Sequence, residues 1–180
     1  MKKLILIGGV LAGGKSTFSH LVGERFGISV VNKDRVKEIL GDNITTANRE
    51  ENKKLSVIAY ELMAYLAEGG GEALILESNF KDHELRDLKA RCDADGCEVL
   101  SIILDGEDAV LHTRFIKRLS ENRHPVHKSQ DFSRIEDFKE TLDELRGAEY
   151  FGEIIRVDCT DFTYQNDEVL FDKIKVFLDK

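Results

Sequence analysis

The chain has 180 residues, of which 42% are hydrophobic and 33% charged, which is typical of a globular protein and excludes a disordered or fibrous one. Its net charge of −8 repels polyanions and argues against binding of long nucleic acid, and no apolar run approaches the roughly 20 residues that cross a bilayer. Three cysteines lack the spacing of a zinc or redox pair, so we expect a cytoplasmic protein with one domain spanning residues 1–180.

Short apolar runs alternate with segments of helical spacing along the chain. The expected strands are Leu4–Ile7, Ile28–Val31, Ala73–Leu76, Val99–Leu104 and Ile154–Val157. The expected helices are Lys15–Phe26, one beginning near Arg35, one around residues 55–66, Asp82–Arg91, Glu107–Leu119, Ile135–Arg146 and one around residues 170–178. This alternation predicts an α/β fold in which helices cover both faces of a parallel sheet.

Two of these helices have an apolar face that we expect to pack against the core. One face consists of Leu55, Ile58, Ala59, Leu62 and Leu66, and the other of Leu170, Ile174, Phe177 and Leu178. Three consecutive glycines at residues 69–71 predict the end of the first of these helices and a turn.

A phosphate-binding sequence lies between the first strand and the first helix. Residues 9–16 read Gly-Val-Leu-Ala-Gly-Gly-Lys-Ser and fit the pattern G-x-x-x-x-G-K-[ST] in the strand-to-helix context that it requires. Backbone N–H groups of such a loop face the phosphate oxygens, and the N-terminus of the following helix adds a partial positive charge. The residues expected to cradle the phosphates are Gly9, Ala12, Gly13 and Gly14.

Three side chains at the end of this loop are expected to contact the nucleotide or its metal. Lys15 can reach the β- and γ-phosphates, the Ser16 hydroxyl can ligate Mg²⁺, and Thr17 can cap the helix or contact the α-phosphate. The competing interpretation is a glycine-rich turn with a solvated lysine. The motif in its context favours a site for ATP and Mg²⁺.

Polar segments follow the second, third and fourth strands: Asn32-Lys33-Asp34-Arg35, Glu77-Ser78-Asn79, and a segment with arginines at 114, 118 and 123. With the phosphate loop, they make the chain similar over nearly its whole length to the small P-loop kinases, a group that contains adenylate kinase, gluconate kinase, chloramphenicol phosphotransferase, zeta toxins and polynucleotide 5′-hydroxyl kinases. The last three are the branch it resembles most. The resemblance implies a three-layer α/β/α P-loop NTPase fold, a five-stranded parallel sheet of order 2-3-1-4-5 and a helical lid at about residues 115–133.

By this resemblance Asp34 is the candidate general base. A carboxylate at the carboxyl edge of a strand next to the phosphate-loop strand would face the transferable phosphate and accept the proton of an attacking hydroxyl. Arg35 would orient an anionic substrate. The alternative is that Asn32 or Asp34 caps the helix that begins near Arg35, and capping is compatible with catalysis.

The same resemblance makes Glu77 a candidate ligand for Mg²⁺ or for its water shell. Related kinases often have Asp at this position, so the longer side chain leaves direct coordination open. The alternative is that Ser78 and Asn79 only begin a helix.

Arginines on and after the helix that follows the fourth strand correspond to those of a mobile lid in related kinases. Arg114 and Arg118 are one helical turn apart and can share a face, and Arg123 would lie at the lid tip. An arginine that closes over the γ-phosphate neutralises the charge on its oxygens, and Arg118 is our first candidate for this role. The alternative is a solvated helix face.

The histidines at 124 and 127 lack a third metal ligand nearby, so a polar lid is favoured over a zinc site. We therefore expect an ATP-dependent phosphotransferase that acts on a hydroxyl of a small-molecule or nucleotide acceptor. The alternatives are a nucleotide-dependent switch without an acceptor and a polynucleotide 5′-hydroxyl kinase with a small basic pocket. That pocket would consist of Arg49, Lys53 and Lys54.

Overall fold

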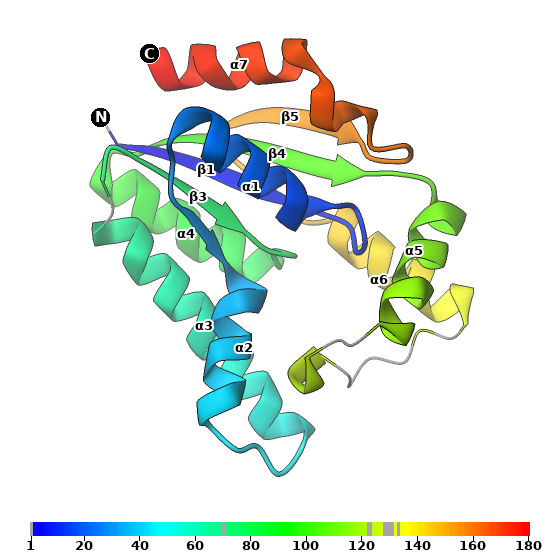
Figure 1. Ribbon diagram of the computed structural model, residues 1–180. Coiled ribbons are helices and arrows are strands. Elements are labelled where there is room, and N and C mark those ends of the chain that lie inside the picture. The colour runs from blue at the N-terminus through cyan, green and yellow to red at the C-terminus, as the bar shows by residue number, and fades with distance from the viewer. Residues whose placement is uncertain (1, 70, 122–123, 128–131, 133) are drawn as a thin grey trace.

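The computed structural model describes residues 2–69, 71–121, 124–127, 132 and 134–180. Its centre is a parallel five-stranded sheet of order β2-β3-β1-β4-β5 (Figure 1). The strands are β1 Lys3–Gly9, β2 Val30–Asn32, β3 Ala73–Glu77, β4 Glu98–Asp105 and β5 Glu153–Asp158. This arrangement confirms the predicted strand order and the α/β/α fold.

Helices connect the strands and cover both faces of the sheet (Figure 1). They are α1 Lys15–Phe26, α2 Lys33–Asn43, α3 Arg49–Gly69, α4 Asp82–Asp95, α5 Asp108–Ser120, α6 Ile135–Arg146 and α7 Glu168–Asp179, with short 3₁₀ helices η1 Pro125–His127 and η2 Thr163–Asn166. Among the described helices, none has both the length and the apolar character that a bilayer crossing needs.

The two faces of β1 belong to two separate apolar cores, because successive side chains of a strand point in opposite directions. Ile5 and Ile7 pack with side chains of α1 and α7 and, further along, of α5 and α6. Leu4 and Leu6 pack with side chains of α3 and α4. The phosphate-loop strand is therefore the most enclosed element of the fold, and its loop has a rigid base.

The second strand begins two residues later than its apolar run predicts. The N–H of Ile28 donates to the carbonyl of Gly23, and Gly27 has the left-handed conformation that ends α1. The chain therefore completes the helix end before Val30 joins the sheet. The short β2 is the edge strand beside β3.

The predicted core face of α3 is partly wrong. Ile58, Leu62 and Leu66 are 41%, 40% and 46% exposed, whereas Leu55 and Ala59 are buried as predicted. The buried face is completed by Tyr60, Met63, Ala64 and Ala67. Small alanines allow α3 to approach the sheet closely, so the large aliphatic residues of the stripe do not mark its inner side. The predicted face of α7 is confirmed, because Leu170, Ile174 and Phe177 are buried and Leu178 packs against them.

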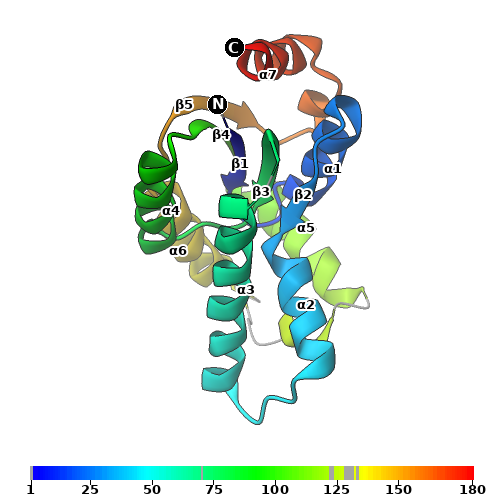
Figure 2. The same ribbon diagram turned by 90° about the vertical axis from the view of Figure 1, so that its left-hand side faces the viewer.

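α2 and α3 lie side by side and extend beyond the sheet (Figure 2). The segment of the predicted lid that the structure describes returns toward this helix pair. There η1 packs on α2, with Val126 in contact range of Gly41. Within the predicted lid range, about residues 115–133, the described secondary structure is the end of α5 and η1, and α6 begins just after this range.

Candidate functional site

The phosphate loop leaves β1 at Gly9 and enters α1 at Lys15. Gly9, Ala12 and Gly14 have positive φ angles of 110°, 58° and 84°. A Cβ on Gly9 would lie 2.0 Å from the carbonyl oxygen of Leu104 in β4, so this position requires glycine. These angles curl the backbone into the loop that the motif predicts.

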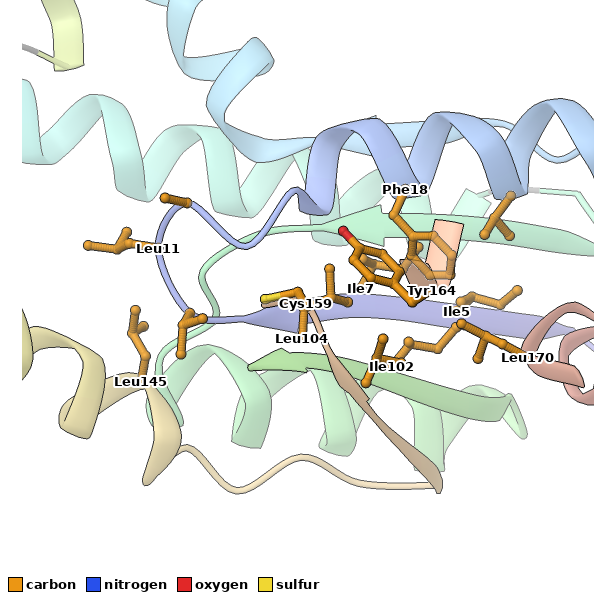
Figure 3. Close-up of a cluster of buried hydrophobic side chains, with 14 of the residues drawn as sticks. Ile5, Ile7, Leu11, Phe18, Ile102, Leu104, Leu145, Cys159, Tyr164 and Leu170 are labelled. Carbon is orange, nitrogen blue, oxygen red and sulfur yellow. The ribbon is translucent and has the colours of Figure 1, made fainter. Parts of the chain in front are cut away.

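Two tyrosines from the C-terminal part of the chain hold this loop. The Gly9 N–H donates to the hydroxyl of Tyr150 at 2.9 Å, and the hydroxyl of Tyr164 donates to the Gly13 carbonyl at 2.9 Å. Figure 3 shows Tyr164 beside Phe18 of α1, and their rings meet edge to face with centroids 5.3 Å apart. The sequence predicts a role for neither tyrosine, because no local pattern connects them with the loop.

Lys15 is buried inside the loop, with 6% of the residue exposed. Its ammonium donates to the Val10 carbonyl at 2.5 Å across the loop. Burial lowers the pKa of Lys15, and the nearby carboxylates of Glu77 and Asp34 oppose this effect. The loop thus encloses a cation whose charge is costly in the ligand-free protein and would be matched by a bound anion.

Ser16, Glu77 and Asn32 form one polar cluster at the carboxyl edge of the sheet. The Ser16 hydroxyl donates to Glu77 Oε2 at 3.1 Å. The Asn32 amide donates to the same Glu77 oxygen and to Ser16 Oγ, the latter at 3.2 Å. The structure therefore brings together the two predicted metal ligands, and Asn32 is a third member that the sequence analysis considered only as a helix cap.

Glu77 is 5% exposed, and this burial raises the pKa of its carboxyl to about 7, although Lys15 beside it acts in the opposite direction. A carboxylate that is poorly solvated and close to a hydroxyl can accept a cation. Within the described part of the chain, no group of three or more His, Cys, Asp or Glu side chains could hold a metal. One carboxylate and one hydroxyl fit Mg²⁺, which takes oxygen ligands and usually keeps several from phosphate and water.

Asp34 lies in the first turn of α2 and is exposed. Its charge affects the pKa of both Lys15 and Glu77, so it lies at the same edge as the loop. The helix cap is Asn32, whose Oδ1 accepts the Arg35 N–H at 2.7 Å. Capping therefore does not occupy Asp34, whose carboxylate has no hydrogen bond or ion pair among the described residues. The Arg35 guanidinium pairs with Glu38 at 3.1 Å on the exposed side of the helix.

The two described lid arginines point to different places. Arg114 donates to the carbonyls of Cys159 and Thr160 at 2.7 and 2.5 Å, and its guanidinium lies 3.6 Å from the centre of the Phe162 ring. It is thus held by the loop after β5.

Arg118 is exposed and has no hydrogen-bonding partner in the described residues. Its charge lowers the pKa of both Lys15 and Glu77, so it lies on the side of the phosphate loop. Arg123 lies outside the described residues.

The segment 124–127 is docked on α2 and α3 by polar contacts. His124 Nε2 lies 2.9 Å from Asp42 Oδ1, and Asn52 of α3 donates to the Val126 carbonyl at 3.0 Å. The second histidine, His127, lies 3.3 Å from Glu38. These contacts connect the predicted lid with α3 and with α2, the helix that carries Asp34, and no sequence motif indicated them.

No protein-family model matches this chain, and no curated protein sequence matches it. Solved structures do share its fold. A candidate kinase from Chloroflexus aurantiacus is 22% identical with a TM-score of 0.78, and the match covers 98% of each chain. Shikimate kinase from Bacteroides thetaiotaomicron is 12% identical with a TM-score of 0.62, covering 99% of each chain. APS kinase from Mycobacterium tuberculosis, solved with AMPPNP and APS, is 14% identical with a TM-score of 0.58, covering 99% of this chain and 98% of that one. The chain therefore has the fold of P-loop kinases.

Proposed function

We propose that this protein is a kinase that transfers the γ-phosphoryl group of Mg–ATP to a hydroxyl group of a small-molecule or nucleotide acceptor. One observation carries the proposal: groups with the complementary charges that phosphoryl transfer requires converge at one edge of the sheet. These groups are the ammonium of Lys15, the Ser16–Glu77 oxygen pair, the carboxylate of Asp34 and the guanidinium of Arg118.

The phosphates are bound by the N–H groups of the loop and by Lys15, which would exchange the Val10 carbonyl for phosphate oxygens. Ser16 and Glu77 would hold Mg²⁺, which when bound supplies positive charge to the phosphate oxygens. Thr17 is exposed at the start of α1, where it can contact the α-phosphate.

Asp34 is the proposed general base, because it is an exposed carboxylate beside the loop that neither the helix cap nor an ion pair with a described residue occupies. It accepts the proton of the acceptor hydroxyl while that oxygen bonds to the γ-phosphorus and the bond to the β-phosphate oxygen breaks, releasing ADP. Arg118 balances the charge that develops on the transferred group. Arg35 would bind an anionic acceptor after leaving Glu38.

The fold shared with APS kinase, a structure that holds AMPPNP and APS, supports ATP as the donor. The same fold in shikimate kinase and in a gluconokinase from Sinorhizobium meliloti supports a small hydroxyl-bearing acceptor. The acceptor side of the site would lie between α2, α3 and the docked segment 124–127.

The test is a mass-spectrometric screen of a metabolite extract with the protein and Mg–ATP, read for a product heavier by one phosphoryl group. Asp34→Asn should reduce turnover of the product-forming reaction by about a hundredfold or more while nucleotide binding persists. The matched control is Asp137→Asn, an exposed aspartate in the first turn of α6.

Full turnover in Asp34→Asn would remove Asp34 as the base. ATP binding without any phosphorylated product would favour a nucleotide-dependent switch. Transfer only to the 5′ end of a labelled oligonucleotide would favour a polynucleotide kinase.

A further inference from the structure

The side chain of Asn32 has three partners that belong to different parts of the site. Its Nδ2 donates to Glu77 Oε2 and lies 3.2 Å from Ser16 Oγ, while its Oδ1 accepts the Arg35 N–H at 2.7 Å. These partners lie at the end of β3, at the start of α1 and in the first turn of α2. A single amide thus connects three elements.

The contacts require both ends of an amide. A helix N–H can only donate, so the side-chain oxygen of Asn32 faces Arg35 and the NH₂ group faces Glu77 and Ser16. A carboxylate at this position would cap the helix equally well, but it would have no N–H to donate and would add negative charge beside Glu77. A serine would cap the helix through a shorter side chain.

The sheet sets the distance between Asn32 and Glu77. The two residues are partners in the register of β2 and β3, at the last paired position of both strands. Side chains of paired residues on neighbouring strands project to the same face, so the amide and the carboxylate meet without any rearrangement. The next residues of the chain form the first turn of α2, which carries Asp34.

We propose that Asn32 is a positioning residue, which holds Ser16 and Glu77 in the geometry that binds Mg²⁺ and fixes the first turn of α2, with Asp34, relative to them. This inference rests on the proposed function. Side chains that hydrogen-bond to metal ligands and orient them typically contribute about tenfold or more to metal affinity. The two metal ligands, Ser16 and Glu77, and the proposed base, Asp34, would then keep fixed positions relative to one another.

The test measures binding rather than turnover. Calorimetry gives the affinity of ATP without metal and then the Mg²⁺ concentration that is half-saturating for the metal-dependent increase in affinity. In Asn32→Ser, which keeps a capping side chain, we expect that Mg²⁺ concentration to rise about tenfold. The affinity for metal-free ATP and the thermal unfolding midpoint should change little, because the loop and the helix cap persist.

Two further variants separate the roles. Asn43→Ser alters an asparagine near the other end of α2 whose side chain donates to the Ile39 carbonyl, and it should bind Mg²⁺ and ATP like the wild type. Asn32→Ala removes cap and amide together, so it should lose thermal stability in addition to the Mg²⁺ effect.

Wild-type Mg²⁺ dependence in Asn32→Ser would overturn the positioning role and leave the proposed function intact. An equal loss of metal-free and metal-dependent binding would also overturn it, because the effect would then belong to the loop as a whole. If the wild type itself bound no ATP with or without Mg²⁺, the proposed function would fail first.

Discussion

The hydroxyl of Tyr164 donates a 2.9 Å hydrogen bond to the carbonyl of Gly13, although the two residues are 151 positions apart in the chain. Burial raises the pKa of this tyrosine to about 12, so the hydroxyl stays protonated and remains a donor at every physiological pH. The bond holds the peptide carbonyl of Gly13, in the phosphate loop, in a fixed position. The loop is therefore shaped by the fold around it as well as by its own glycines.

Replacing this tyrosine tests how far the loop depends on it. Tyr164→Phe keeps the ring against Phe18 but leaves the buried Gly13 carbonyl without its donor, which should reduce the free energy of unfolding by about 1–3 kcal/mol. ATP affinity should fall several-fold as the loop loosens. Thermal unfolding and calorimetry measure both effects. Tyr65→Phe is the control, since Tyr65 is 67% exposed, and equal behaviour of the two variants would contradict the prediction.

A methyl group at Gly9 should disrupt the loop more severely. Gly9→Ala combines a φ of 110° with a Cβ 2.0 Å from the Leu104 carbonyl oxygen, so β1 and β4 would have to separate locally. We expect a loss of about 2 kcal/mol or more in the free energy of unfolding and no measurable ATP binding. Gly69→Ala, whose added Cβ meets no atom within 4 Å, should be close to neutral. Denaturant unfolding distinguishes the two variants. A stable Gly9→Ala variant that binds ATP would refute the requirement for glycine at this position of the phosphate loop.

The two described lid arginines should separate stability from catalysis. Arg118→Ala should lower the rate of phosphoryl transfer by about a hundredfold or more, because it removes the charge that balances the transferred group. Its thermal midpoint should change little, because Arg118 has no hydrogen-bonding partner among the described residues. Arg114→Ala should instead lower the thermal midpoint, because it removes two hydrogen bonds to carbonyls and the stacking on Phe162. Single-turnover kinetics and thermal unfolding on both variants check this division. The reverse pattern would assign the phosphate role to Arg114.

The buried carboxyl of Glu77 predicts a pH-dependent stability of the ligand-free protein. Its pKa rises from 4.5 to about 7 on folding, so the folded state binds more protons between these values and the contribution of this group to stability falls as the pH rises through 7. Glu77→Gln is neutral at every pH. Its thermal midpoint should exceed that of the wild type, and the difference should grow between pH 5 and pH 8, by about 2–4 °C per kcal/mol.

The measurement is thermal unfolding at several pH values without nucleotide. The same variant should lose the Mg²⁺ dependence of ATP binding. It would therefore be more stable than the wild type but unable to bind the metal. A constant difference in midpoint across the pH range would show that Glu77 does not titrate there. Glu98→Gln, at the opposite end of the sheet in β4, is the control for a general charge effect.

Much of the fold was predictable because its signals are local. The phosphate loop is a contiguous motif, and the strand that precedes it is a contiguous apolar run. Ser16 was predicted from this motif and Glu77 from the resemblance to P-loop kinases, and the structure brings their side chains together. The sheet order came from resemblance and is confirmed.

The contacts that tune the site were not predictable, because they join distant segments. Tyr150 lies 141 positions after Gly9, and neither residue has a pattern that indicates the other. The core face of α3 was misjudged because hydrophobicity ranks Leu62 above Ala64, whereas close packing against the sheet favours the smaller side chain. These features depend on contacts between residues far apart in the chain and on side-chain volume. The periodic spacing of hydrophobic residues reveals neither.

The two tyrosine contacts also bear on the order in which the protein matures during synthesis. β1 and its loop emerge from the ribosome early, but β4, Tyr150 and Tyr164 follow much later in translation. A nascent chain that has just completed α1 carries the entire phosphate motif without the groups that give it its form. The fully shaped phosphate loop would therefore form only after Tyr150 and Tyr164 have been synthesised, well after the motif itself.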